Sequence, residues 1–197
     1  MTDDHKSKMQ DLQTKQREKI AQTEDPGRGL ILVHTGDGKG KSSSAFGVAI
    51  RALGWGKTVG VVQFIKGKWI TGERQFFKKL PEVTWHTMGE GFTWDTQDRD
   101  RDIAAATAAY AKACEMMASG DYDLILLDEI NIALRYDYLD INAVIDGLKA
   151  RDDRTSVILT GRDAKPELMD YADLVSEMTE VKHPFKSGIK AQRGIDF

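Results

Sequence analysis

The chain has 197 residues, of which 41% are hydrophobic and 30% charged, and its formal net charge is −3. This length and composition predict one globular domain with a sizeable core. The small negative charge argues against a general nucleic-acid binder, and no run is long and apolar enough to span a bilayer. The single cysteine, Cys114, excludes an internal disulfide. Together these features predict a cytoplasmic protein with neither a nucleic-acid nor a membrane partner.

The first 28 residues differ from the rest, because they carry six acidic and six basic residues and few large apolar ones. Met9, Leu12 and Ile20 lie roughly along one helical face, so a short, marginal helix is one expectation and a disordered tail is the other. The turn sequence at 25–27 then separates this segment from the remainder of the chain. We predict an N-terminal arm at 1–28, which could cover a ligand or a neighbouring subunit, and a domain at 29–197.

Strand and helix patterns alternate after the arm. Short apolar runs predict strands at 30–34, 58–64, 83–88, 124–127, 156–160 and 174–178. Helices are predicted at 42–53, 73–80, 103–118, 140–150 and 166–171. Apolar strands separated by helices predict an α/β fold with a mainly parallel sheet covered on both faces. Ligands bind such sheets at the carboxyl ends of the strands.

A glycine-rich turn follows the first predicted strand and opens the first helix, with the sequence TGDGKGKSSS at 35–44. Glycines let backbone N–H groups surround phosphate oxygens, and a helix N-terminus favours negative charge. Lys41 can reach terminal phosphates, and the Ser42 hydroxyl can bind magnesium. The stretch is one residue shorter than the usual phosphate loop, because Thr35 stands where the first glycine is expected. The alternative is a strand–helix turn without a ligand.

Two acidic residues, Asp128 and Glu129, end the apolar strand at 124–127. A carboxylate in this position helps to hold the magnesium ion that bridges phosphates. Glu129 is our first choice as the ligand and Asp128 the second; the alternative is that both acids cap the following helix. Arg162, after the fifth strand, either reaches a phosphate or pairs with Asp163.

A glycine-flanked loop after the third strand carries two large aromatic residues, Phe92 and Trp94. Large aromatic side chains are costly to leave in water. They either plug the edge of the core or form an apolar wall for a large, flat ligand.

Six sequence blocks together closely resemble the ATP:cob(I)alamin adenosyltransferases of the bacterial corrinoid-salvage type. The blocks are TGDGKGKSS at 35–43, VQFIKG at 62–67, GEGFTW at 89–94, LDEI at 127–130, LTGR at 159–162 and GIKAQRGIDF at 188–197. The resemblance implies a RecA-like phosphate-loop fold and a homodimer. The implied reaction moves the 5′-deoxyadenosyl group of ATP onto the cobalt of a reduced corrinoid and releases triphosphate.

The resemblance also implies roles for particular residues. The nucleotide would be held by Gly36, Asp37, Gly38, Lys39, Gly40, Lys41, Ser42 and Ser43, with Arg51 and Arg162 as further contacts. Ser42 and Glu129 would bind Mg²⁺ or Mn²⁺. Phe92 and Trp94 would face the corrin and displace the lower axial ligand of cobalt, so that a flavodoxin-type protein can reduce it. Lys41, Phe92 and Trp94 are therefore the catalytic candidates. A RecA-like ATP hydrolase or kinase, and a non-catalytic ATP-binding interaction protein, are the alternative functions.

Replacing Phe92 and Trp94 by alanine should impair adenosylation most when the corrinoid is supplied as cob(II)alamin with a protein reductant. The reason is that the aromatic pair is expected to act on cobalt before its reduction. Chemically reduced cob(I)alamin should largely restore the rate in the same variant. Equal losses in the two assays would contradict the predicted role.

Overall fold

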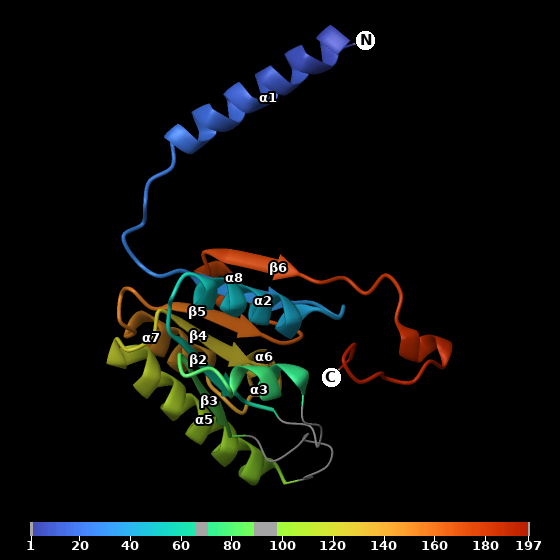
Figure 1. Cartoon of the computed structure of the whole chain (residues 1–197). Helices are drawn as coiled ribbons and strands as arrows, with labels where there is room; N and C mark the ends of the chain where they lie inside the picture. Colours follow the sequence, from blue (N-terminus) through green and yellow to red (C-terminus); the bar gives the residue numbers. More distant parts are fainter. Residues whose placement is uncertain (1, 66–70, 89–97, 197) are drawn as a thin grey trace.

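A six-stranded parallel sheet forms the centre of the domain (Figure 1). The computed structural model describes residues 2–65, 71–88 and 98–196. The strands are β1 (Ile31–Thr35), β2 (Val59–Gln63), β3 (Val83–Thr87), β4 (Leu124–Asp128), β5 (Ser156–Thr160) and β6 (Leu174–Glu177), in the order β3-β2-β4-β5-β1-β6. Every neighbouring pair is parallel, so all six carboxyl ends lie at one edge. The predicted α/β fold is confirmed.

Helices cover both faces of the sheet, as the continuous apolar strands predicted. On one face, side chains of α2 (Lys41–Gly54) and α3 (Gly72–Phe77) pack on the strands. The other face carries α5 (Arg99–Ser119), α6 (Ile130–Arg135), α7 (Ile141–Lys149) and α8 (Pro166–Tyr171). Strand β4 is buried along its whole length and contributes to both cores. The carboxylate of Asp128, the last residue of β4, therefore lies at the sheet edge on a strand that is packed on both faces.

Several boundaries differ from the predictions for local reasons. Helix α5 begins at Arg99, four residues before the predicted start, because the Asp98 side chain accepts a hydrogen bond from the Arg101 N–H and caps it. The predicted cap of α7 by Asp140 is confirmed, since its carboxylate accepts a 2.9 Å hydrogen bond from Ala143 N–H. Helix α6 and the short 3₁₀ helix η1 (Pro184–Ser187) were not predicted.

The N-terminal segment forms a 20-residue helix, α1 (Thr2–Ala21), which is longer than the short helix considered from the sequence. Residues 5–21 are exposed, and Figure 1 shows α1 standing away from the sheet. No helix in the described part of the chain is long and apolar enough to cross a bilayer. The role of the arm stays a prediction.

Asp173 fixes the start of β1 against the start of β6. Its carboxylate accepts hydrogen bonds from the Ile31 N–H at 2.8 Å and from the Arg28 guanidinium at 2.5 and 2.8 Å. The hydrogen bond from Arg28 is the main reason why the pKa of Asp173 falls to about 2. Since β1 leads directly into the glycine-rich turn, this contact helps to set the register of the segment that carries the site.

Substituting Asp173 by asparagine should lower the free energy of unfolding by about 1 kcal/mol at neutral pH, because Arg28 is partly exposed and screened by solvent. The pKa of Asp173 is lowered by folding, so its stabilisation is present above about pH 4 and is lost as the pH falls towards 2. Urea unfolding should show a smaller difference at pH 2.5 than at pH 7, because pH 2.5 lies between the unfolded and the folded pKa of Asp173. An equal difference at the two pH values would contradict this assignment.

Candidate active site at the carboxyl edge of the sheet

The turn at 36–40 connects β1 to α2 and can be built only with glycine at several positions. Gly36 and Gly40 have φ values of +92° and +110°, and Gly40 precedes the first residue of α2. A Cβ atom on Gly36 would lie 2.5 Å from the Met178 carbonyl oxygen, and one on Gly38 would lie 2.8 Å from it. The loop is therefore pressed against the chain that leaves β6, and α2 begins directly after it.

Lys41 places its ammonium group inside this loop. The side chain is buried, and its Nζ atom donates a 2.6 Å hydrogen bond to the Gly38 carbonyl oxygen. Burial lowers the pKa of Lys41, and nearby Arg162 lowers it further, whereas Glu129 opposes the shift. An anion in the loop would give this cation a stronger partner than a neutral carbonyl. The phosphate-binding role of Lys41 stays a prediction.

Asp128 connects four elements of the site. This buried carboxylate, at the end of β4, accepts hydrogen bonds from Gln63 at the end of β2 (3.1 Å) and Thr160 at the end of β5 (2.9 Å). Ser42, in the first turn of α2, lies close enough to influence its pKa as a third donor. Burial raises the pKa of Asp128, and the three donors oppose that shift. Ser42 therefore lies beside Asp128 at the start of α2.

Glu129 has a different environment from its neighbour. It adopts a left-handed backbone conformation (φ 63°) before α6, and its N–H group donates a 3.0 Å hydrogen bond to the Thr160 hydroxyl. Burial, followed by the adjacent Asp128, raises the pKa of Glu129 to about 7, while Lys41 and Arg162 oppose the rise. Within the described residues no hydrogen bond to the Glu129 carboxylate is recorded, so its oxygens remain available.

The predicted ligands Ser42 and Glu129 suit a magnesium ion that is bound partly by the protein and partly by a phosphate ligand. Magnesium usually takes one or two carboxylates and completes its coordination with phosphate oxygens and water. The two predicted ligands, the Ser42 hydroxyl and the Glu129 carboxylate, are oxygen donors of the kind that magnesium prefers. No cluster of three His, Cys, Asp or Glu side chains that could hold a metal ion exists in the described ranges.

Arg162 lies after β5 and close enough to influence the pKa values of Lys41 and Glu129. It does not form the considered pair with Asp163, whose carboxylate pairs with Arg135 at 2.8 Å. Arg162 also lines a cavity of about 440 Å³ beside the loop. The other lining residues are Asp37, Glu177, Thr179, Glu180 and Lys186.

Other predicted residues are less close to the centre of the loop. Arg51 is exposed in the last turn of α2, about 15 Å along the helix axis from Lys41 at 1.5 Å per residue. Ser43 is exposed at the start of the same helix. The structure therefore does not bring Arg51 to the phosphate loop. Phe92 and Trp94 lie outside the described residues, so their predicted role is unchanged.

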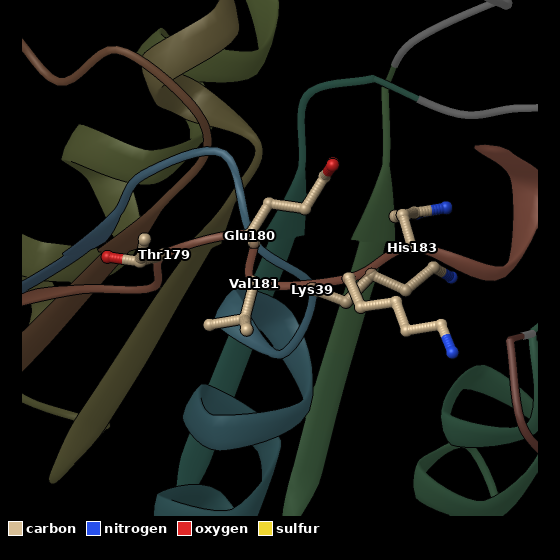
Figure 2. A pocket seen from close by; sticks show the side chains of 7 residues that line it. Lys39, Thr179, Glu180, Val181 and His183 are labelled. Atoms are coloured by element: carbon tan, nitrogen blue, oxygen red, sulfur yellow. The ribbon is translucent and has the colours of Figure 1, made fainter.

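Lys39, unlike Lys41, turns out of the loop and pairs with Asp196 near the C-terminus. It also lines a second cavity, of about 320 Å³, together with the chain that follows β6 (Figure 2). Lys39 was predicted to lie in the loop as a contact to the nucleotide. Its ion pair with Asp196 was not predicted.

Sequence reasoning assigned no role to several residues that complete the site. Gln63 and Thr160 are polar residues at the ends of apolar strands, which is a signal that could have found them. Asn131 is fully buried in α6, and its Nδ2 donates a 3.1 Å hydrogen bond to the Gly161 carbonyl. That contact holds the turn before Arg162, but it depends on a helix that was not predicted.

The sheet, the glycine loop and the acidic strand end define a phosphate-loop nucleotide-binding protein of the α/β class. The family of ATP:corrinoid adenosyltransferases BtuR/CobO/CobP matches residues 27–197. The chain therefore belongs to that family.

Curated relatives cover nearly the whole chain. A corrinoid adenosyltransferase of Pseudomonas aeruginosa is 54% identical over 194 residues, which span 98% of this chain and 95% of the relative. The corrinoid adenosyltransferase of Escherichia coli K12 is 45% identical, covering 98% and 97% of the two chains. Corrinoid adenosyltransferase CobA of Salmonella typhimurium is 47% identical, covering 91% and 90%.

Replacing Thr160 by valine should destabilise the protein by about 1–3 kcal/mol, because the buried Asp128 loses a donor and the Glu129 N–H loses its acceptor. Valine keeps the shape of threonine, so packing changes little. Serine at the same position keeps the hydroxyl and serves as the control. Thermal or urea unfolding would measure the loss, and equal stability of the two variants would contradict the role of the hydroxyl.

Proposed function

We propose that this protein transfers the 5′-deoxyadenosyl group of ATP to the cobalt of cob(I)alamin or a related corrinoid and releases triphosphate. The observation that carries the proposal is a phosphate loop, with its buried lysine and acidic partner, in a chain that belongs to the ATP:corrinoid adenosyltransferase family. The names of the relatives support the same activity.

The reaction requires little covalent chemistry from the protein. The cobalt(I) lone pair attacks C5′ of ATP, the cobalt–carbon bond forms, and the C5′–oxygen bond breaks with its electron pair leaving on triphosphate. Cobalt is formally oxidised to cobalt(III) as the bond forms. The protein must orient C5′ and stabilise the charge of the leaving triphosphate. Loop N–H groups, Lys41 and Arg162 would supply that stabilisation.

Magnesium or manganese would be held by Ser42 and Glu129 and would neutralise part of the phosphate charge. A hydrogen bond donated by Ser42 to Asp128, which lies beside it, would leave the serine lone pairs for the metal. Asp128 then acts through Ser42 and need not bind the metal itself. This division of roles keeps Glu129 as the first choice among the two carboxylates.

The remaining parts of the proposal rest on the family resemblance, except the cytoplasmic location, which rests on composition. The protein would act as a homodimer, in the cytoplasm, with a flavodoxin-type protein as the source of electrons. Phe92 and Trp94 would face the corrin, and the arm that contains α1 would cover the corrinoid site.

Anaerobic incubation with ATP, magnesium and chemically reduced cob(I)alamin tests the proposal directly. The corrinoid spectrum and the phosphate products are followed together. A light-sensitive adenosylated corrinoid with one triphosphate per turnover is the expected result. ADP with an unchanged corrinoid would instead establish a hydrolase or kinase and overturn the proposal.

Replacing Lys41 by alanine should lower kcat/KM for ATP by about 100-fold or more, because the leaving triphosphate loses its main positive partner. The control is Lys149→Ala, which removes an exposed lysine from α7. Circular dichroism should show that both variants are folded. Near-normal turnover by the Lys41 variant would remove the phosphate-loop assignment.

A further inference from the structure

The chain that follows β6 returns across the sheet edge and is held there by few contacts. Figure 1 shows it leaving β6, turning through η1 and coming back to the domain at the C-terminus. Most of residues 179–196 are exposed, including Val181 and Ile195 at 93% and 82%. Among the described residues, Lys39 to Asp196 is the only recorded hydrogen bond between this segment and the rest of the domain. We call residues 179–196 the C-terminal segment.

Met178, which directly precedes the C-terminal segment, is hydrogen-bonded to the phosphate loop and to the strand before it. Met178 N–H donates a 2.8 Å hydrogen bond to Thr35, and the Met178 carbonyl accepts a 2.7 Å hydrogen bond from Gly38 N–H. The backbones of Met178 and Thr179 also occupy the space that a Cβ on Gly36 or Gly38 would need. One end of the segment therefore cannot move without moving the loop.

The far end of the C-terminal segment is attached to the same loop by an ion pair. Lys39 Nζ contacts one carboxylate oxygen of Asp196, and the other oxygen accepts a 2.8 Å hydrogen bond from Gln192 N–H. The hydrogen bond from Lys39 is the main reason why the pKa of Asp196 is lowered. Since Gln192 and Asp196 belong to one turn, Asp196 joins that turn to the loop.

A cavity of about 320 Å³ lies between the loop and the first part of the segment. It is lined by Gly38, Lys39, Thr179, Glu180, Val181, Lys182 and His183. Figure 2 shows Lys39 and His183 near one end of this cavity and Thr179 near the other. The acidic member, Glu180, is already paired with Lys186. Lys39 is paired with Asp196 in the same way, so Lys182 supplies the remaining positive charge of the lining, which suits an anion next to the phosphate loop.

We propose that Asp196 is a positioning residue that clasps the C-terminal segment onto Lys39, so that the segment forms the outer wall of the site for the triphosphate of ATP. The inference rests on the proposed function, because it takes the loop to be the nucleotide site. Asp196 acts through Lys39 and through the segment, without contact to the reacting atoms.

The Lys39–Asp196 ion pair is weak enough to let the C-terminal segment move away from the loop during turnover. Lys39 is half-exposed, and an exposed ion pair changes an equilibrium by about fivefold at most. A triphosphate must enter with ATP and leave as product, so a permanent closure would slow its release. We therefore expect a measurable but modest effect on nucleotide binding when Asp196 is changed.

The first test measures the clasp without any reaction. Limited trypsin digestion of the full chain is followed by intact mass, scoring cleavage after Lys182, Lys190 and Arg193. Asp196→Asn should increase cleavage at these sites about two- to fivefold. Asp146→Asn is the matched control, because it removes a surface aspartate–lysine ion pair from α7. Unchanged cleavage in the Asp196 variant would overturn the proposal that Asp196 holds the segment on the loop.

Two further variants show whether Asp196 acts through Lys39. Asp196→Glu keeps the carboxylate and should restore much of the protection from trypsin. In a Lys39→Met background, Asp196→Asn should add no further cleavage, since the ion pair is already lost. An additional increase of the same size would show that Asp196 acts independently of Lys39 and would overturn the proposed connection.

The second test measures ATP binding with magnesium by calorimetry and then steady-state kinetics. Asp196→Asn should raise the Kd and KM for ATP about two- to fivefold and leave kcat nearly unchanged. Faster trypsin cleavage with unchanged ATP affinity would overturn the proposal that the segment forms a wall of the triphosphate site. If the unaltered protein binds ATP but makes no adenosylated corrinoid, the proposed function fails, while the digestion and binding results still decide the inference.

Discussion

The hydrogen bonds to the buried carboxylate of Asp128 are the interaction on which the site depends. An ionised carboxylate inside a protein is costly unless donors surround it. Here the hydrogen bonds come from β2 and β5, and Ser42 of α2 lies beside the same carboxylate, so three elements must reach the end of β4 together. Parallel pairing makes this possible, because Gln63 lies directly opposite Asp128 in the ladder. The cost of the buried charge is thereby offset only when the sheet edge is correctly assembled.

The glycine loop is held by a similar long-range constraint. Pairing of Thr35 with Glu177 brings the end of β6 beside the start of the loop. The Met178 carbonyl then accepts a hydrogen bond from the Gly38 N–H. The Met178 backbone also leaves no room for side chains on Gly36 and Gly38. The glycines therefore serve two purposes, because they allow positive φ angles and admit the neighbouring chain.

The charges of the site are arranged for a ligand that is itself highly charged. Lys41 is buried against a neutral carbonyl, and Glu129 is raised in pKa to about 7 by burial and by its acidic neighbour. Neither group has a full partner within the described residues. A triphosphate with a divalent cation would satisfy both, since phosphate suits the lysine and the cation suits the carboxylate. This complementarity agrees with the proposed adenosyl transfer.

The sequence by itself determined the local features of this protein. Apolar runs marked the strands, glycines and Lys41 marked the loop, and the two acids marked the end of β4, since each signal lies within a few residues. Only the tertiary structure decided which residues complete the site. Thr160 and Gln63 donate to Asp128 across the sheet, and Asp196 reaches Lys39 from 157 residues away. Such contacts depend on strand order and register, which are properties of the assembled sheet, so no local pattern records them.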